Sequence, residues 1–283
     1  MIPKIIHYCW FGGNPLPELA EKCIASWKKH CPDYELMLWN EANFDVNTVP
    51  FTAQVAKAKK WGFIVDYIRA YVVFHYGGIY LDTDVELLKP FGITMLKNKC
   101  FSGFEGNNIA PGLVFAGEKG CVIAKELMGF YSSYNFIKEN GELNLTVSPK
   151  IFSNILLKYG LKQNNSYQEL GVITVYPTEF FCPKDFHTGT VSITDNTYSI
   201  HHYDASWVPE DKRKWIQKRW NIYKKYSDDE LVIDLLEQYE KLKNSDCYSM
   251  PLKILYKVVI KRTFKRLKEK FYYFIAKLRK KFR

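Results

Sequence analysis

The sequence predicts an α/β protein with one large domain and a basic helical tail. Apolar strand-like segments alternate with helical segments in the first third of the chain. An acidic pair follows an apolar segment near residue 80, and apolar side chains recur at helical spacing after residue 250. The 283 residues are 47% hydrophobic and 16% aromatic, which is sufficient for one well-filled core.

The N-terminal third has a strand–helix–strand order. Apolar residues favour strands at about residues 4–10 and 34–39, with a helix near residues 16–29 between them. A further helix is predicted at about residues 61–75, ending at a Gly-Gly pair. We therefore expect a βαβ-like start, followed by a helix that leads into the acidic segment.

The rest of the chain has no repeats or low-complexity segments. Residues 97–200 mix short strands and helices, and a polar segment at residues 243–246 precedes Pro251. This polar segment predicts a hinge. We divide the chain into a folded body, residues 1–249, and a tail, residues 250–283.

The cysteines and the N-terminus indicate a reducing compartment. The seven cysteines are odd in number, scattered, and show neither a CxxC pair nor zinc-finger spacing, so we expect reduced core thiols. The first residues lack a signal peptide's charged start and apolar stretch, and no uncharged segment is long enough to span a bilayer. A cytoplasmic location is expected.

The acidic pair Asp82 and Asp84 is the strongest chemical signal. On a continuous strand, residues two apart point to the same side, so the two carboxylates would converge on one ligand. Hard oxygen donors favour Mg²⁺, Mn²⁺ or Ca²⁺, and an incomplete protein cage leaves coordination positions for phosphate oxygens. The alternative is a polar turn that merely ends a strand.

The net charge of +10 belongs to the tail. Residues 250–283 contain thirteen Lys and Arg against one Glu, so the tail carries +12 and the body −2. This distribution predicts no nucleic-acid partner for the body. Apolar residues at three- and four-residue steps make the tail a basic amphipathic helix that suits an anionic membrane surface. The alternatives are a helix packed on the body and an RNA-binding arm.

Four segments together resemble glycosyltransferase family 32, which includes capsular-polysaccharide sugar transferases and is related to fungal initiating mannosyltransferases and clostridial glucosylating toxins. They occur in the family's order and cover the chain to about residue 207. One departure is Val65, where the family commonly has Ser before Asp66. The matching segments are residues 2–13, 66–69, 77–84 and 201–207.

The resemblance implies a GT-A fold, a Rossmann-like nucleotide-sugar-binding domain whose DxD motif holds Mn²⁺ or Mg²⁺ against a diphosphate. By carry-over from the family's DxD, Asp84 would ligate the metal directly and Asp82 would contact the ribose or a metal-bound water. The cation would keep both carboxylates ionised. Residues 1–249 would then be the catalytic domain.

Residues near the first strand and on the second helix complete the expected donor site. Trp10 would stack on the nucleobase, and Gly12 and Gly13 would let the backbone approach the ligand closely. Asp66 would contact hydroxyls of the donor sugar, and Arg69 would contact the leaving phosphate. The alternatives are a core tryptophan, an ordinary turn, and an ion pair on a helix surface.

The late segment resembles the loop that closes over the diphosphate in related enzymes. His202 would supply a third metal ligand, with His201 as its rival. Adjacent residues on an extended segment face opposite ways, so we expect only one of the two to reach the metal. Ser206 and Trp207 would cover the diphosphate. An ordinary core pairing of aromatic side chains with histidine is the alternative.

The resemblance implies a retaining hexosyltransferase that uses a nucleotide-sugar, with a UDP-sugar favoured and a GDP-sugar possible. The acceptor would be a glycan or a lipid-linked oligosaccharide in surface polysaccharide synthesis, at the inner face of the cell membrane. No acid in the sequence is marked as a nucleophile, which favours front-face transfer over a double displacement.

Two other functions fit parts of the same sequence. Asp82-Thr83-Asp84-Val85 also resembles the signature of haloacid dehalogenase-type phosphatases, in which the first Asp, here Asp82, is the nucleophile. That signature usually lies near the chain start, and its later acidic pair would have to be Asp228-Asp229. A non-catalytic, membrane-bound nucleotide-sugar-binding protein is the other alternative.

Overall fold

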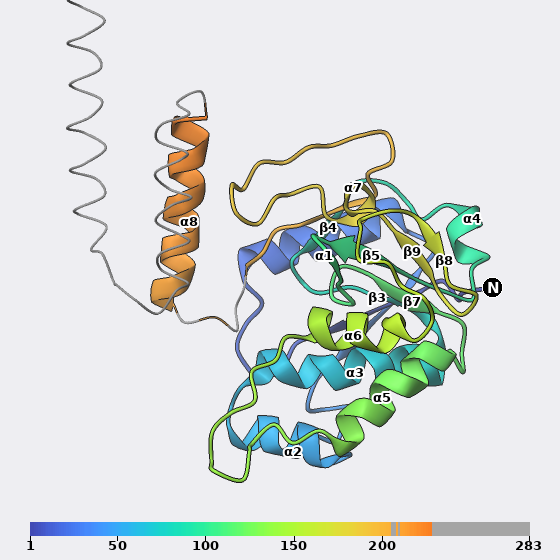
Figure 1. Ribbon diagram of the computed structural model, residues 1–283, viewed down its shortest axis with the longest axis vertical. Helices are drawn as coiled ribbons and strands as arrows, with labels where there is room; N and C mark the ends of the chain where they lie inside the picture. Colours follow the sequence, from blue (N-terminus) through green and yellow to red (C-terminus); the bar gives the residue numbers. More distant parts are fainter. Residues whose placement is uncertain (205–207, 209, 228–283) are drawn as a thin grey trace, which may run out of the picture. The chain divides into compact units, whose positions relative to one another are not determined.

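The structure is a computed structural model that describes residues 1–204, 208 and 210–227 (Figure 1). The chain divides into two compact units, Met1–Ile216 and Gln217–Arg283. Within the second unit, the described residues belong mainly to the end of helix α8 (Glu210–Lys225). The predicted boundary after residue 249 and the basic tail lie outside the described residues, so both stay predictions.

The first unit begins with the predicted βαβ arrangement. Strand β1 (Ile5–Cys9) pairs in parallel with β2 (Glu35–Trp39), and helix α1 (Glu18–His30) connects them. The helix buries an apolar face that includes Cys23 and Trp27. This periodic apolar face is the reason the sequence predicted the helix within two residues at each end.

Helix α3 (Trp61–Tyr76) confirms the second predicted helix. It follows the short helix α2 (Pro50–Lys57) and ends where Gly77 adopts a φ of +69°. A Cβ on Gly77 would lie 2.8 Å from the backbone nitrogen of Lys119, so both conformation and space require glycine. Gly77 thereby turns the chain from the helix into the sheet.

The main sheet has the order β2-β1-β3-β7-β5-β9-β8, with β6 paired to β5. Its first three strands are mutually parallel, whereas β7 runs antiparallel to both β3 and β5. The change of direction at β7 ends the Rossmann-like half of the sheet. The strands beyond β2 are β3 (Gly78–Tyr80), β5 (Cys100–Glu105), β6 (Asn108–Ile109), β7 (Phe115–Gly117), β8 (Gln168–Glu169) and β9 (Thr174–Tyr176).

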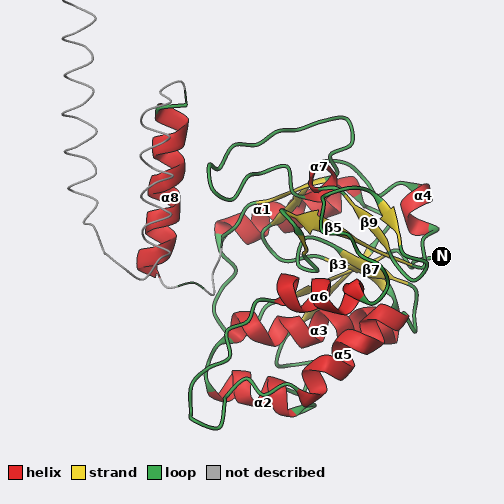
Figure 2. Ribbon diagram, in the orientation of Figure 1, coloured by secondary structure: helices red, strands yellow, loops and turns green. Residues whose placement is uncertain are grey.

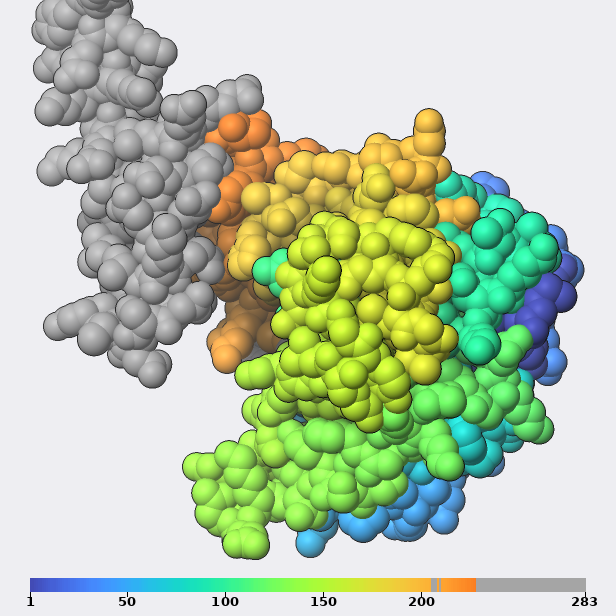
Figure 3. All heavy atoms as spheres, turned by 45° about the vertical axis from the view of Figure 1, so that its right-hand side comes forward, coloured from blue at the N-terminus to red at the C-terminus, as the bar shows by residue number. Residues whose placement is uncertain are grey.

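Helices cover the sheet on two sides. Helices α2, α3, α5 (Val122–Ser133) and α6 (Ser148–Leu157) lie on one side and share one buried core, whereas α1 lies on the other (Figures 1 and 2). The segments that include α5, α6 and β9 form a broad face of the first unit (Figure 3). Two further helices are single turns, α4 (Ile93–Leu96) and α7 (Thr178–Phe181).

A small second sheet joins the acidic segment to the late histidine segment. Strand β4 (Val85–Leu87) pairs antiparallel with β10 (Ser199–His201), and His201 lies opposite Val85. Backbone hydrogen bonds extend this pairing, since the amide of His202 donates to the carbonyl of Asp84 at 2.9 Å. Residues more than a hundred positions apart are thus placed together by backbone pairing.

The acidic pair does not lie on a continuous strand, which corrects the prediction. Strand β3 ends at Tyr80, and residues 81–84 form a turn in which the amide of Val85 donates to the carbonyl of Asp82 at 3.1 Å. The amide of Asp82 donates to the carbonyl of Gly112 at 2.9 Å. Asp and Thr favour such turns because their side chains compete for backbone hydrogen bonds. The two carboxylates therefore converge through a turn rather than through strand alternation.

The cysteines of the described residues carry free thiols, and the reduced state expected from the sequence stays a prediction. Six thiols are free and buried, and the seventh, Cys247, lies outside the described residues. Among the described helices, none is long and apolar enough to cross a membrane.

Candidate functional site

The candidate site is built around the turn that carries Asp82 and Asp84. Both carboxylates lie with the imidazole of His201, and one ligand atom from each residue lies within 4.8 Å of the others. The acidic turn follows the carboxyl end of β3, and His201 comes from β10. The two hard carboxylates are donors that Mn²⁺ and Mg²⁺ prefer, and the imidazole would add a third ligand that suits a transition metal better than Mg²⁺.

Asp82 is fixed by neighbours that the sequence did not identify. The hydroxyl of Tyr80 donates to its Oδ1 at 2.7 Å, and Nη2 of Arg69 lies 3.4 Å from the same oxygen. A Cβ on Gly112 would lie 2.1 Å from its Oδ2, so only glycine leaves room for this carboxylate. No sequence motif marked Tyr80 and Gly112, because they matter only through their closeness to the Asp82 carboxylate in the folded chain.

Arg69 connects the turn to helix α3. Its Nη2 lies 3.2 Å from Oδ1 of Asp66, three residues earlier on the helix, and its Nη1 donates to Oγ of Ser148 at 3.0 Å. Asp66 and Arg69 are only 5% and 4% exposed, so the alternative of an ion pair on a helix surface is wrong. The pair is held inside the protein, directly beside Asp82.

Burial and charge act against each other on this pair. Burial raises the pKa of Asp66 to about 6, although the neighbouring guanidinium opposes the shift. Burial alone would lower the pKa of Arg69, but the carboxylates of Asp82 and Asp66 outweigh it and raise that pKa. Arg69 is therefore a permanent positive charge next to the turn.

Asp84 faces a different set of partners. Its Oδ1 lies 3.3 Å from Nε2 of His201, and its Oδ2 accepts the backbone amide of Asp204 at 2.9 Å. Burial alone would raise the pKa of Asp84, but the charge of His201 and these hydrogen bonds lower it. For His201, burial alone would lower the pKa, but Asp84 outweighs it and raises the pKa well above its usual value.

Only one of the two histidines shares the acidic pair's ligand set. His201 lies with Asp82 and Asp84, whereas Nε2 of His202 lies 2.7 Å from Oε2 of Glu86. The same Glu86 oxygen accepts Nζ of Lys22 at 2.9 Å. Adjacent residues on an extended segment face opposite ways, so the geometry favours the rival His201 over His202 as a metal ligand.

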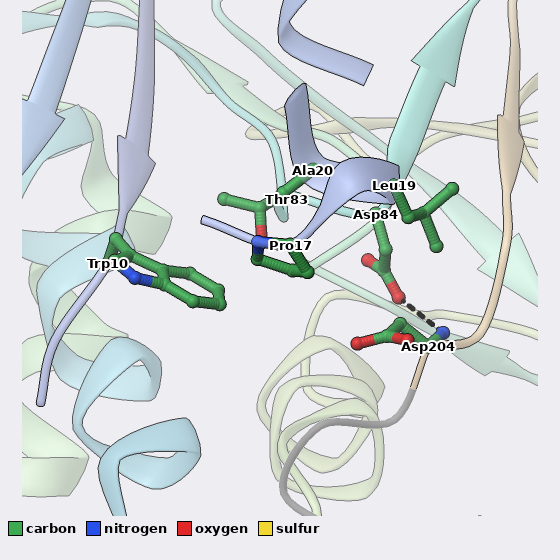
Figure 4. A pocket seen from close by; sticks show the side chains of 7 residues that line it. All are labelled: Trp10, Pro17, Leu19, Ala20, Thr83, Asp84 and Asp204. Carbon is green, nitrogen blue, oxygen red and sulfur yellow. Dashed lines mark hydrogen bonds between the residues drawn. The ribbon is translucent and has the colours of Figure 1, made fainter. Parts of the chain in front are cut away.

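Trp10 lies at a small pocket beside the acidic turn. The pocket is lined by Trp10, Pro17, Leu19, Ala20, Thr83, Asp84 and Asp204 (Figure 4). The Nε1–H of Trp10 donates to the carbonyl of Asn14 at 2.6 Å, and the side chain is half-buried. An indole in this position leaves a nucleobase-stacking role available, and that role stays a prediction.

The two glycines of the first loop differ. Both have positive φ, but a Cβ on Gly12 would lie 2.6 Å from Cδ1 of Trp61, whereas Gly13 has open space around it. Gly12 is thus required by the packing of Trp61, and Gly13 by its conformation alone. Ser206 and Trp207 lie outside the described residues, so their expected roles stay predictions.

The site as a whole has more acidic than basic groups. Five carboxylates lie near or within it, from Asp66, Asp82, Asp84, Glu105 and Asp204, and the positive charges that act on them come from Arg69, Lys184, His201 and Arg213. Burial, together with the charge of Asp84, raises the pKa of Asp204. A divalent cation would relieve this repulsion, so the residues present fit the metal that the resemblance implied.

Comparison with known proteins agrees with this geometry. The family described as glycosyltransferase sugar-binding region containing DXD motif matches residues 17–102. The chain is 22% identical over 300 residues to Subversion of eukaryotic traffic protein A of Legionella pneumophila, covering 89% of this chain and 46% of that protein. It is 35% identical over 88 residues to inositol phosphoceramide mannosyltransferase 2 of Schizosaccharomyces pombe, covering 30% of this chain and 25% of that enzyme. The chain thus spans less than half the length of these relatives.

Two solved structures are also similar. PaToxG Glycosyltransferase matches with a TM-score of 0.46 and 23% identity, over 56% of this chain and 69% of that one. A glycosyltransferase involved in glycosylation of the major capsid of PBCV-1 matches with a TM-score of 0.42 and 12% identity, over 76% and 100%.

The mixed sheet, with a DxD turn at the end of its parallel part, is the GT-A arrangement expected from the sequence. The matched region contains α1, α3 and the acidic turn, and therefore most of the residues that the site brings together. The match over residues 17–102 and the mannosyltransferase relative together support a DXD-containing glycosyltransferase.

Proposed function

We propose that the protein is a metal-dependent, retaining glycosyltransferase that transfers a sugar from a nucleotide-diphosphate donor. One observation carries the proposal: Asp82, Asp84 and His201 converge next to the buried Arg69. This arrangement offers a cation site and a permanent positive charge side by side. Both features suit a substrate whose leaving group is a diphosphate.

Asp84, His201 and Asp82 would hold the Mn²⁺ or Mg²⁺ ion. When bound, such an ion neutralises charge on the diphosphate and orients it. Asp84 is the best direct ligand because its pKa is lowered, so the carboxylate stays ionised. Asp82, which accepts the Tyr80 hydroxyl, is already oriented and needs no rearrangement to accept a ribose hydroxyl or a bound water.

Arg69 and Asp66 would position the donor from helix α3. The guanidinium of Arg69 is held by two carboxylates and Ser148, which fixes it in place before the substrate arrives. Asp66 is committed to this ion pair, which makes it a poor nucleophile for a double displacement. Front-face transfer, in which the chain mainly positions groups and excludes water, therefore suits this site better.

The donor is proposed to be a UDP-sugar, with a GDP-sugar as the alternative, and Trp10 to stack on its base. For the acceptor, the mannosyltransferase relative is named for inositol phosphoceramide, a lipid. That name supports a lipid-linked or membrane-presented glycan acceptor here. A role in surface polysaccharide synthesis is part of the same proposal.

A panel of UDP- and GDP-sugars, assayed for nucleotide release, tests the function without an acceptor. We expect slow hydrolysis of one donor that requires Mn²⁺ or Mg²⁺ and stops with a chelator. Release from none of the donors, with metal and a glycan or lipid acceptor supplied, would contradict the proposal. Donor binding without release would favour the non-catalytic nucleotide-sugar-binding protein.

The phosphatase alternative uses the same acidic turn but a different chemistry. It would require Asp82 to attack phosphate, yet this carboxylate accepts the Tyr80 hydroxyl and lies against Arg69. The family match to residues 17–102 also assigns the turn to a sugar-binding region. Release of inorganic phosphate from a simple aryl phosphate, abolished by Asp82→Asn, would revive this alternative.

The location is proposed to be cytoplasmic, at the inner face of the cell membrane, through residues 250–283. The tail's charge of +12 and its helical apolar spacing support this proposal. Binding to anionic liposomes should fall when residues 250–283 are deleted and when salt is raised. Unchanged liposome binding of the deletion variant would contradict the membrane role.

A further inference from the structure

The imidazole of His201 lies between two separate groups of possible ligands. Its Nε2 is 3.3 Å from Oδ1 of Asp84, and its Nδ1 is 3.2 Å from Oε2 of Glu105. On the Nδ1 side, ligand atoms of Glu105, Cys182 and His201 all lie within 4.8 Å of one another. The second group is chemically distinct from the first, because it contains a thiol.

Two further observations single out this second group. The Nδ1 atom of His201 is buried and makes no aligned hydrogen bond, despite its short distance to Glu105. Tyr203 has a φ of +59°, its hydroxyl lies 3.0 Å from Sγ of Cys182, and its ring centroid lies 4.3 Å from that of His201. A buried nitrogen without an aligned hydrogen bond and a strained neighbour are features that concentrate at functional sites.

We propose that Glu105, Cys182 and His201 form a second metal site, selective for a thiophilic ion such as Zn²⁺. One thiolate, one imidazole and one carboxylate are three ligands of a tetrahedral zinc centre, and an added water would complete the coordination. Manganese and magnesium prefer the Nε2 side of the His201 imidazole, where the other ligands are the carboxylates of Asp82 and Asp84. The two sites therefore differ in the metals they accept. Glu105 is 28% exposed, which gives the ion a route from solvent.

The shared imidazole makes the two sites antagonistic. A neutral imidazole has one nitrogen with a free lone pair, and the other nitrogen carries the proton. Zinc on Nδ1 would leave Nε2–H to donate to Asp84, and a cation on Nε2 would leave Nδ1–H to donate to Glu105. In both states a carboxylate holds the second nitrogen, which is the usual arrangement around a metal-bound histidine. Zinc would therefore weaken binding of Mn²⁺ by removing one of its ligands.

Spectroscopy with Co²⁺ as a zinc substitute tests the second site in the full-length, reduced protein. We expect a thiolate-to-cobalt charge-transfer band that Zn²⁺ removes and that Cys182→Ser abolishes. Cys31→Ser is the matched control, because it removes a buried thiol of the described residues that is not in the cluster, and it should retain the band. Circular dichroism and thermal melting of the metal-free variants check that each one is folded.

Affinity and competition give a second readout. Cys182→Ser and Glu105→Gln should each weaken Zn²⁺ binding at least about 10-fold, the lower bound for loss of an outer-shell partner. Electron paramagnetic resonance of Mn²⁺ should show that one equivalent of Zn²⁺ weakens Mn²⁺ binding in the wild type but not in Cys182→Ser. The proposal is overturned if folded Cys182→Ser keeps the cobalt band or the wild-type Zn²⁺ affinity, or if Zn²⁺ displaces Mn²⁺ equally from both proteins.

Discussion

Asp82 and Asp84 are two positions apart in the sequence, yet their carboxylates are held by different kinds of partner. Asp82 lies against the buried guanidinium of Arg69, which comes from α3, and the hydroxyl of Tyr80, which comes from β3. Asp84 lies against an imidazole and a backbone amide from the late segment. The first carboxylate thus has a permanent positive partner, and the second has a partner whose charge and ligands can change.

The difference separates a rigid half of the site from an exchangeable half. The Asp82 half consists of groups that are buried and engaged with one another, such as Asp66 and Arg69. The Asp84 half depends on His201, whose two nitrogens face two carboxylates. We infer that the rigid half positions the substrate, whereas the exchangeable half admits the metal. Substitutions at four positions test this division.

Removing the Asp84 carboxylate should have the largest effect. Asp84→Ala should lower transfer more than about 100-fold, since loss of outer-shell partners alone costs about 10–100-fold. Asp84→Asn keeps the shape and should show a similar loss. Steady-state assays with donor and Mn²⁺ measure the effect, and Asp33→Ala on the surface is the control. Turnover of Asp84→Ala equal to that of the control would show that this carboxylate holds no metal.

Removing Arg69 should lower both transfer and stability, and the loss of stability tests the rigid half. Arg69→Ala leaves the buried Asp66 and the partly exposed Asp82 without their positive partner, and breaking a buried pair such as Asp66–Arg69 costs about 3–5 kcal/mol. Urea unfolding monitored by circular dichroism measures the loss in the free energy of unfolding. Lys4→Ala, which breaks the exposed Lys4–Asp33 pair, should change this free energy very little. Equal changes in the free energy of unfolding of the two variants would show that the buried ion pairs of Arg69 do not hold this half of the site in place.

Adding one methyl group at Gly112 should disturb the same half more weakly. A Cβ there would meet Asp82 at 2.1 Å, so Gly112→Ala should cost about 1–3 kcal/mol and displace the carboxylate. Gly129, in helix α5, has open space, and Gly129→Ala should instead stabilise the helix by up to about 1 kcal/mol. Thermal unfolding of the two variants should therefore shift in opposite directions. Shifts of the same sign would contradict the close contact.

The smallest effect is the pH dependence of the exchangeable half in the metal-free protein. Because the pKa of His201 is raised, its contribution to stability is full below the unfolded value of about 6.5 and is lost as pH rises through the folded pKa. The lowered pKa of Asp84 gives a contribution that is present above about 3.8 and is lost in acid. Urea unfolding of wild type and His201→Gln at several pH values measures the difference. The difference in the free energy of unfolding between wild type and His201→Gln should become smaller above neutral pH. A difference that becomes larger there would contradict the raised pKa of His201.

The sequence predicted the elements whose signals are local. The periodic apolar faces of α1 and α3 and the apolar strands β1 and β2 were confirmed nearly to their ends. The i, i+3 spacing of Asp66 and Arg69 likewise placed them on one side of a helix, as observed. Helical and strand periods depend only on neighbouring residues, so the chain itself contains this information.

The turn at the acidic pair shows where local reasoning failed. The alternation rule assumed a continuous strand, but the chain leaves the sheet after Tyr80, and the amide of Asp82 pairs with Gly112 instead. The convergence of the carboxylates was predicted correctly, although its geometric cause was wrong. Gly112 had no sequence signal, because glycine is needed there only to leave room for Asp82, which lies thirty positions earlier in the chain.

The sequence by itself determined the α/β class and the identity of the acidic pair, because motifs and periodicity are written in consecutive residues. Only the tertiary structure decided that His201 rather than His202 joins that pair. It also placed Glu105 and Cys182 next to the same histidine. The pairing of β4 with β10 sets which histidine faces inward. Strand register is fixed by contacts between distant segments, and a one-residue shift would exchange the two histidines.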